Sequence, residues 1–242
     1  MQHLLIVGSP RSGTSLLTWL LGSQDGIAIS SEVKGKAWYR VVGHETVGVK
    51  LCVPEQIRLQ PQSRLTRNFK RLEKNLFRPL HAVFGPPFHR PHLPGKMSIT
   101  DFMEFEDPLV VGVFRDPHEV TESIMSRGKQ PKWVAHATYA DAIESIHGAW
   151  SENRDRVQLV DFDQLIADPE TVVQSLCQSL GVPFDRERLS GYTKNYRRGD
   201  IDVNKKGGRS HASRLDHAVF RKRPDVAARY SELIESVSSR AE

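Results

Sequence analysis

The chain begins with a short apolar run that leads into a glycine-containing turn rich in hydroxyl groups. Leu4 to Val7 precede the turn, and residues 8–15 read Gly-Ser-Pro-Arg-Ser-Gly-Thr-Ser. A Gly-x-x-x-x-Gly spacing followed by hydroxyl residues is typical of a phosphate-binding loop between a strand and a helix. In such a turn the backbone N–H groups converge on an anion, and the helix dipole lies behind them. The motif predicts an anion site at the end of the first strand.

One position of this loop departs from the nucleotide-binding pattern. Thr14 stands where kinases and ATPases carry the lysine that reaches the outer phosphates of a magnesium-bound nucleotide. Here Arg11 supplies the positive charge from within the loop, and Thr14 and Ser15 supply hydroxyls. This set suits a 5'-phosphosulfate, because a terminal sulfonate carries less charge than a terminal phosphate and needs no magnesium clamp. The residues expected to bind it are Ser9, Pro10, Arg11, Ser12, Gly13, Thr14 and Ser15.

The elements that must position this loop follow an alternating pattern. Short apolar runs alternate with helical patterns, which predicts an α/β fold with a parallel sheet. The run 109–114 is apolar on both faces, as expected of a central strand. The predicted fold is a P-loop-type central parallel sheet between helices, a three-layer αβα arrangement, in one domain spanning residues 1–242. The other expected strands are 4–7, 27–29, 47–52 and 157–160, and the expected helices begin at Ser15, Asp116, Trp133 and Asp168.

The helix after the central strand has a clear start signal. Asp116 is the predicted N-cap, Pro117 takes the first helical position, and Glu119 is expected to complete a capping box.

Residues 54–96 do not follow the strand–helix alternation. Leu65, Phe69 and Leu72 begin an apolar stripe at helical spacing that is surrounded by arginine and lysine, and a Pro/His-rich stretch follows it. We expect a basic helical insertion or lid over the active-site edge of the sheet. The alternatives are a cap helix with a solvated basic face and a surface for anionic acceptors or membrane lipids.

Composition limits the classes of protein that the chain can belong to. The net charge of +5 permits an anionic ligand without requiring nucleic acid. Cys52 and Cys177 are the only cysteines, and neither disulfide nor metal-ligand spacing occurs, so we expect buried thiols and no metal site. No apolar run is long enough to span a bilayer, and no signal peptide precedes the first strand. The expected location is the cytoplasm.

The loop and two later segments together resemble a known family. The run from Pro10 to Leu17 resembles the 5'-phosphosulfate-binding motif of the sulfotransferases that use 3'-phosphoadenosine-5'-phosphosulfate (PAPS) as donor. Arg115 ends the central strand and Ser123 follows eight residues later, at the spacing of the family's 3'-phosphate site. A guanidinium fork with a hydroxyl suits a phosphate. Residues 160–165 resemble a later strand–helix segment, with Asp161 and Phe162 in place of the family's arginine and tyrosine.

The resemblance also indicates the catalytic groups. In the glycan- and tyrosine-modifying branches a glutamate just after the second strand acts as base, and Glu32 matches it. Another branch uses histidine, so His81, His89 and His92 remain alternatives. A lysine would stabilise charge on the leaving phosphate. Lys50, a charged residue within an apolar strand, and Lys96, at a spacing closer to the family's, are both candidates.

A basic glycine-containing run near the C-terminus resembles the family's loop over the 3'-phosphate. The residues expected to contact the donor there are Lys205, Gly207, Gly208 and Arg209.

The resemblance implies transfer of a sulfonate from PAPS to a hydroxyl or amine acceptor, with 3'-phosphoadenosine-5'-phosphate (PAP) as product. The expected acceptor is a small molecule or a glycan, and the positive charge of the insertion hints at an anionic or polyhydroxyl acceptor such as a glycan. A nucleotide kinase or NTPase is one rival, opposed by the missing loop lysine and the lack of a Walker-B acid. A non-catalytic nucleotide-binding module is the other.

Overall fold

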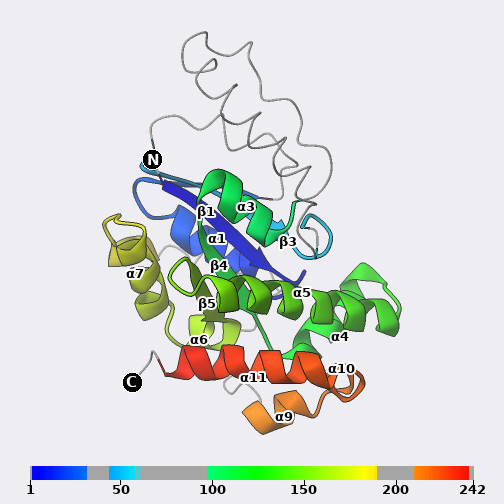
Figure 1. The fold of residues 1–242 in the computed structure, drawn as a ribbon. Coiled ribbons are helices and arrows are strands. Elements are labelled where there is room, and N and C mark those ends of the chain that lie inside the picture. The colour runs from blue at the N-terminus through cyan, green and yellow to red at the C-terminus, as the bar shows by residue number, and fades with distance from the viewer. Residues whose placement is uncertain (1, 32–43, 58, 60–96, 190–209, 240–242) are drawn as a thin grey trace.

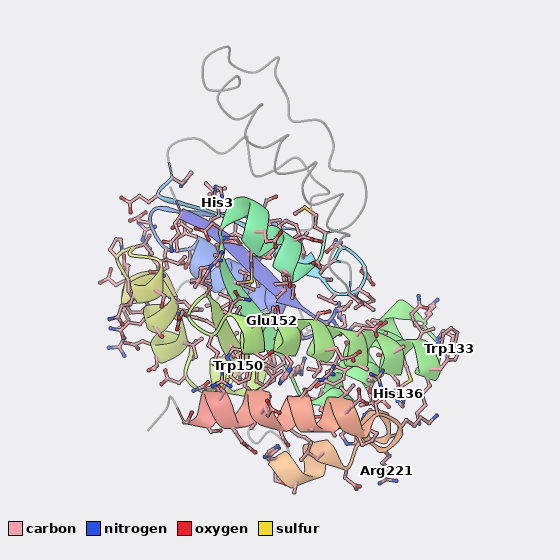
Figure 2. The ribbon with its side chains drawn as sticks, in the orientation of Figure 1. His3, Trp133, His136, Trp150, Glu152 and Arg221 are labelled. Carbon is pink, nitrogen blue, oxygen red and sulfur yellow. The ribbon has the colours of Figure 1, made fainter. Side chains whose placement is uncertain are left out.

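A computed structural model describes residues 2–31, 44–57, 59, 97–189 and 210–239 of the chain (Figure 1). The predictions that concern Glu32, Lys96 and residues 60–96 and 190–209 lie outside these ranges.

A parallel sheet of five strands forms the centre of the fold. The strands are β1 (Gln2–Gly8), β2 (Ile27–Ser31), β3 (Thr46–Cys52), β4 (Leu109–Phe114) and β5 (Val157–Asp161). Their order across the sheet is β2-β3-β1-β4-β5, and every neighbouring pair is parallel. β1 therefore lies in the middle. The chain runs from β1 to β2 at one edge, returns to β3, and then crosses over β1 to β4 on the other side. The predicted α/β class and parallel sheet are confirmed.

Helices pack on both faces of this sheet and create two apolar cores. One core joins β1 and β4 to α1 (Thr14–Gly22), α6 (Phe162–Ala167) and α7 (Pro169–Ser179). The other joins the opposite face to α3 (Ile99–Glu106), α4 (Pro117–Gly128) and α5 (Lys132–Glu152). Both faces of β1 are fully buried, since Leu4, Leu5, Ile6 and Val7 alternate between the two cores. The three-layer arrangement is thus the one predicted.

The C-terminal part of the chain adds three helices for which the sequence patterns gave no prediction. They are α9 (His211–Leu215), α10 (Ala218–Lys222) and α11 (Pro224–Ser238). Figure 1 shows α11 running alongside α5, and α11 also contacts β5. Its buried stripe of Val226, Tyr230, Leu233 and Val237 belongs to the same core as α5.

The start of α4 is largely as predicted, with one difference. The Asp116 carboxylate accepts a hydrogen bond from the His118 N–H, and Pro117 opens the helix. Glu119, however, forms an ion pair with Arg115 one turn earlier. The guanidinium at the strand end attracts this carboxylate, and the capping box of Glu119 stays a prediction.

Both cysteines are buried thiols outside any disulfide, as predicted. Burial raises the pKa of the Cys177 thiol to about 11, so this thiol stays protonated at neutral pH. Among the residues in the structure's described ranges, no helix is long and apolar enough to cross a membrane.

Three histidines join α4, α5 and α10. The ring centroids of His118 and His217 lie 4.3 Å apart, and those of His136 and His217 lie 5.1 Å apart. Nδ1 of His217 accepts a hydrogen bond from the Val219 N–H at 3.3 Å, so the ring proton belongs on Nε2, which lies 3.4 Å from Thr121 Oγ1. Burial and the nearby charges of Lys132 and Lys222 lower the pKa of His136.

This lowered pKa makes the free energy of unfolding depend on pH. The folded state disfavours the protonated ring, so the unfolded chain takes up a proton first as the pH falls below about 6.5. Stability is fully present above that pH and is lost as the pH falls through the folded-state pKa. Each unit of pKa difference corresponds to about 1.4 kcal/mol. Urea titrations of His136→Gln between pH 7.5 and 5 should show a flatter profile than the parent chain. The matched change at the exposed His44 should keep the parent's slope, and equal slopes for both variants would contradict the assignment.

Candidate active site

The loop between β1 and α1 forms a tight cradle that only glycine can complete at two positions. A Cβ at Gly8 would lie 2.4 Å from Ser12 Oγ and 2.7 Å from the Val113 carbonyl oxygen. A Cβ at Gly13 would lie 2.0 Å from the Phe162 ring. Arg11 and Gly13 both have left-handed backbone conformations, with φ of 72° and 96°, and turn the chain around the space between them.

The hydroxyl groups of this cradle are buried and in part unpaired. Ser9 and Ser12 are 2% and 0% exposed, and neither Oγ has a hydrogen-bond partner among the described residues. The N-cap of α1 is Gly13, so no side chain caps the first N–H groups of that helix. A buried hydroxyl without a partner costs about 1–3 kcal/mol, which a bound anion would remove. The cradle therefore fits a phosphate or sulfonate group.

Lys50 reaches this cradle from the neighbouring strand. It is 2% exposed on β3, and its Nζ donates a hydrogen bond to Ser15 Oγ at 3.3 Å. In the sheet it pairs with Ile6 of β1 and with Ser31, the last residue of β2. A buried ammonium beside the loop supplies positive charge in a low-dielectric environment.

The two predicted phosphate sites are in contact with each other. Arg11 of the loop donates through Nε to Ser123 Oγ on α4 at 3.0 Å. Arg115 donates in turn through Nη1 to the Arg11 carbonyl oxygen at 3.5 Å. The parallel sheet brings these residues together, because the ends of β1 and β4 lie at the same edge.

The guanidinium of Arg115 is held on several sides. Its Cζ lies 4.2 Å from the centroid of the Phe162 ring, and Nη2 pairs with Glu119. Tyr139 fixes the backbone by donating its O–H to the Arg115 carbonyl oxygen at 2.7 Å. Nε of Arg115 is buried and has no hydrogen-bond partner among the described residues. One donor of a rigidly held guanidinium thus remains available to an anion.

The sequence patterns missed the contribution of Phe162 and Glu119. The sequence comparison identified Phe162 only as a replacement for the family's tyrosine, whereas its ring packs against both the loop and Arg115. The signal that the sequence offered was a pair of aspartates, Asp161 and Asp163, on either side of the apolar Phe162.

Several predicted site residues cannot be placed. They lie outside the described ranges and are Glu32, Lys96, Lys205, Gly207, Gly208, Arg209, His81, His89 and His92. Within the described ranges, no group of three or more His, Cys, Asp or Glu side chains is placed to hold a metal ion.

Comparison with known proteins bears on the class of this site. Residues 102–186, from α3 to the segment after α7, match the sequence model of the Sulfotransferase family. No curated protein matches the chain. The family resemblance expected from the sequence is confirmed, and it covers Arg115, Ser123 and Phe162.

Several solved structures are similar to the chain, and the first of those that follow shares its fold. The sulfotransferase domain from the Synechococcus PCC 7002 olefin synthase is 16% identical, with a TM-score of 0.50 over 96% of this chain and 94% of that chain. The sulfotransferase domain from the curacin biosynthetic pathway is 21% identical, with a TM-score of 0.46 over 88% and 82%. Sulfotransferase STF1 from Mycobacterium tuberculosis H37Rv is 14% identical, with a TM-score of 0.48 over 96% and 77%. The family match, together with the fold, supports sulfonate transfer as the general chemistry.

The contact between Gly13 and Phe162 leads to a stability prediction. Gly13→Ala should lower the free energy of unfolding by about 2 kcal/mol or more, because the new methyl group meets the ring and φ is positive. Gly148→Ala, in the middle of α5 with open space around it, should instead raise stability by about 0.5–1 kcal/mol. Denaturant unfolding of both variants measures this difference in sign, and equal effects would contradict the geometry.

Proposed function

We propose that this chain transfers a sulfonate group from PAPS to a hydroxyl or amine acceptor. The observation that carries the proposal is the continuous contact from the loop through Arg11 to Ser123 and Arg115. It joins two anion sites, as a donor with a 5'-phosphosulfate and a 3'-phosphate requires. The chain acts as one domain, with residues 54–96 as an insertion that shapes the acceptor site.

Each end of the donor has a set of residues in this proposal. Arg11, Thr14 and the unpaired hydroxyls of Ser9 and Ser12 bind the phosphosulfate. Arg115 and Ser123 bind the 3'-phosphate, and the buried Nε of Arg115 favours an anion there. The backbone of the loop and the basic run that includes Lys205, Gly207, Gly208 and Arg209 complete the donor site.

The reaction would proceed by in-line attack at sulfur. The acceptor oxygen or nitrogen bonds to sulfur while the bond from sulfur to the bridging phosphate oxygen breaks, and that oxygen keeps the electron pair. Lys50 is suited to stabilise the charge on the departing phosphate, since it bonds to Ser15 beside the loop. Lys96 is the second candidate for this role. No metal is required for these steps.

Glu32 is the base in this scheme and takes the acceptor proton. It follows Ser31 directly in the sequence, and Ser31 pairs with Lys50 in the sheet. The proposed base thus follows directly, in the sequence, the strand that pairs with the strand of Lys50. The acceptor in this proposal is a small molecule or a glycan.

Ligand-induced stabilisation tests the donor assignment. PAP without magnesium should raise the melting temperature, whereas Mg-ATP should not, because the loop lacks the lysine that nucleotide kinases need. The opposite pattern would favour the kinase rival. Binding of PAP without transfer of labelled sulfonate to any member of an acceptor panel would favour the non-catalytic module.

The same titration locates the 3'-phosphate. Arg115→Ala should weaken PAP binding by about 1.5–3 kcal/mol, the scale of a charged hydrogen bond. Arg156→Ala is the matched control, since Arg156 pairs with Asp107 away from the loop and should leave PAP affinity unchanged. Equal affinities for the two variants would overturn the assignment of Arg115.

A separate prediction concerns the base. Glu32→Gln should keep PAP affinity and lower turnover about 100-fold or more, since it removes the proton acceptor. Glu45→Gln, at the exposed start of β3, should retain turnover. Full activity of the Glu32 variant would shift the role of base to another residue.

A further inference from the structure

The Phe162 ring lies between the loop and the guanidinium of Arg115. Phe162 is 3% exposed, and its ring packs against Gly13, where a side chain would otherwise lie. The Arg115 Cζ lies over the ring, 4.2 Å from its centroid. A guanidinium stacked on a desolvated aromatic face gains both electrostatic and packing energy. The ring therefore fixes the plane in which the donors of Arg115 point, while Glu119 holds one end of that plane.

Arg214 of α9 binds the residues on both sides of this ring in the sequence. It is 6% exposed, and it pairs with Asp161 at 2.9 Å and also with Asp163, the two residues that flank Phe162. Asp161 in turn caps α6 by accepting from the Asp163 N–H at 3.1 Å. Nη1 of Arg214 also lies 3.4 Å from the Tyr230 hydroxyl on α11.

The charges of Asp161 and Asp163 explain why a cation is needed at the position of Arg214. Burial, together with the charge of Asp161, raises the pKa of Asp163, so the two carboxylates are costly without a cation. A guanidinium can bond both at once as a planar fork, which an ammonium cannot do. Removing this cation would release the start of α6 and with it the Phe162 ring.

We infer that Phe162 is a positioning residue for the 3'-phosphate site, and that Arg214 acts on this site through Phe162. The inference rests on the proposed donor function. It assigns a role to a segment beyond the family match, which ends at residue 186. Through Arg214, α9 thereby supports the donor site. Arg214 itself is not assigned a contact with the donor.

Four variants test the role of the ring by calorimetric titration with PAP. Phe162→Leu should raise the dissociation constant roughly 10-fold, the scale of a desolvated cation–π contact. Phe162→Tyr keeps the ring and should bind within about twofold of the parent chain. Phe102→Leu makes the same change at a partly buried ring of α3 and should leave PAP affinity unchanged. Arg214→Lys, which keeps the charge and avoids two unpaired buried carboxylates, should raise the dissociation constant about 3- to 10-fold.

A double-mutant cycle then tests the coupling. If Arg214 acts through the ring, Arg214→Lys should have no further effect on PAP affinity in the Phe162→Leu chain, although it still lowers the melting temperature. If the two substitutions instead raise the dissociation constant independently, so that the double variant shows the product of the two factors, the coupling is overturned. Equal affinities of Phe162→Leu and Phe102→Leu would overturn the role of the ring. A parent chain that fails to bind PAP would overturn the proposed function, and the ring is then judged by the same cycle with inorganic phosphate.

Discussion

The contact on which the site depends is the one between the backbone of Gly13 and the ring of Phe162. A side chain at position 13 would occupy the volume of the ring, so the loop and α6 can approach only because glycine is there. The ring then supports the guanidinium of Arg115, whose Nη1 reaches back to the Arg11 carbonyl oxygen. Loop, ring and guanidinium therefore form one packed unit.

The order of the strands decides which residues this unit can recruit. β1 is central, with β3 beside it on one side and β4 on the other, and the chain crosses over β1 where it passes from β3 to β4. Open parallel sheets bind ligands at such a point, beyond the carboxyl ends of the strands. Lys50 on β3 and Arg115 after β4 thus flank the same loop from opposite sides.

Buried polar groups at this edge are arranged at a cost to the fold. The hydroxyls of Ser9 and Ser12 and the Nε of Arg115 are buried without partners in the described part of the chain. Other buried polar atoms also lack a partner among the described residues, including those of Thr46, Ser145 and Trp150, whereas Arg214 is paired with two aspartates. The unpaired groups of Ser9, Ser12 and Arg115 differ from these in lying around one loop, as expected of a site that is preorganised for an anion.

The sequence by itself determined the parallel α/β fold, the loop at residues 8–15 and the placement of Arg115 at a strand end with Ser123 in the following helix, because apolar periodicity and motif spacing are local properties. It also indicated Asp116 as a helix cap, since capping depends on adjacent residues. Only the tertiary structure decided that Ser123 bonds to Arg11, that Phe162 lies against Gly13, and that Arg214 closes on Asp161 and Asp163. Those contacts join residues up to about 150 positions apart, from Gly13 to Phe162. No local pattern encodes them, because they arise when both faces of the sheet are packed.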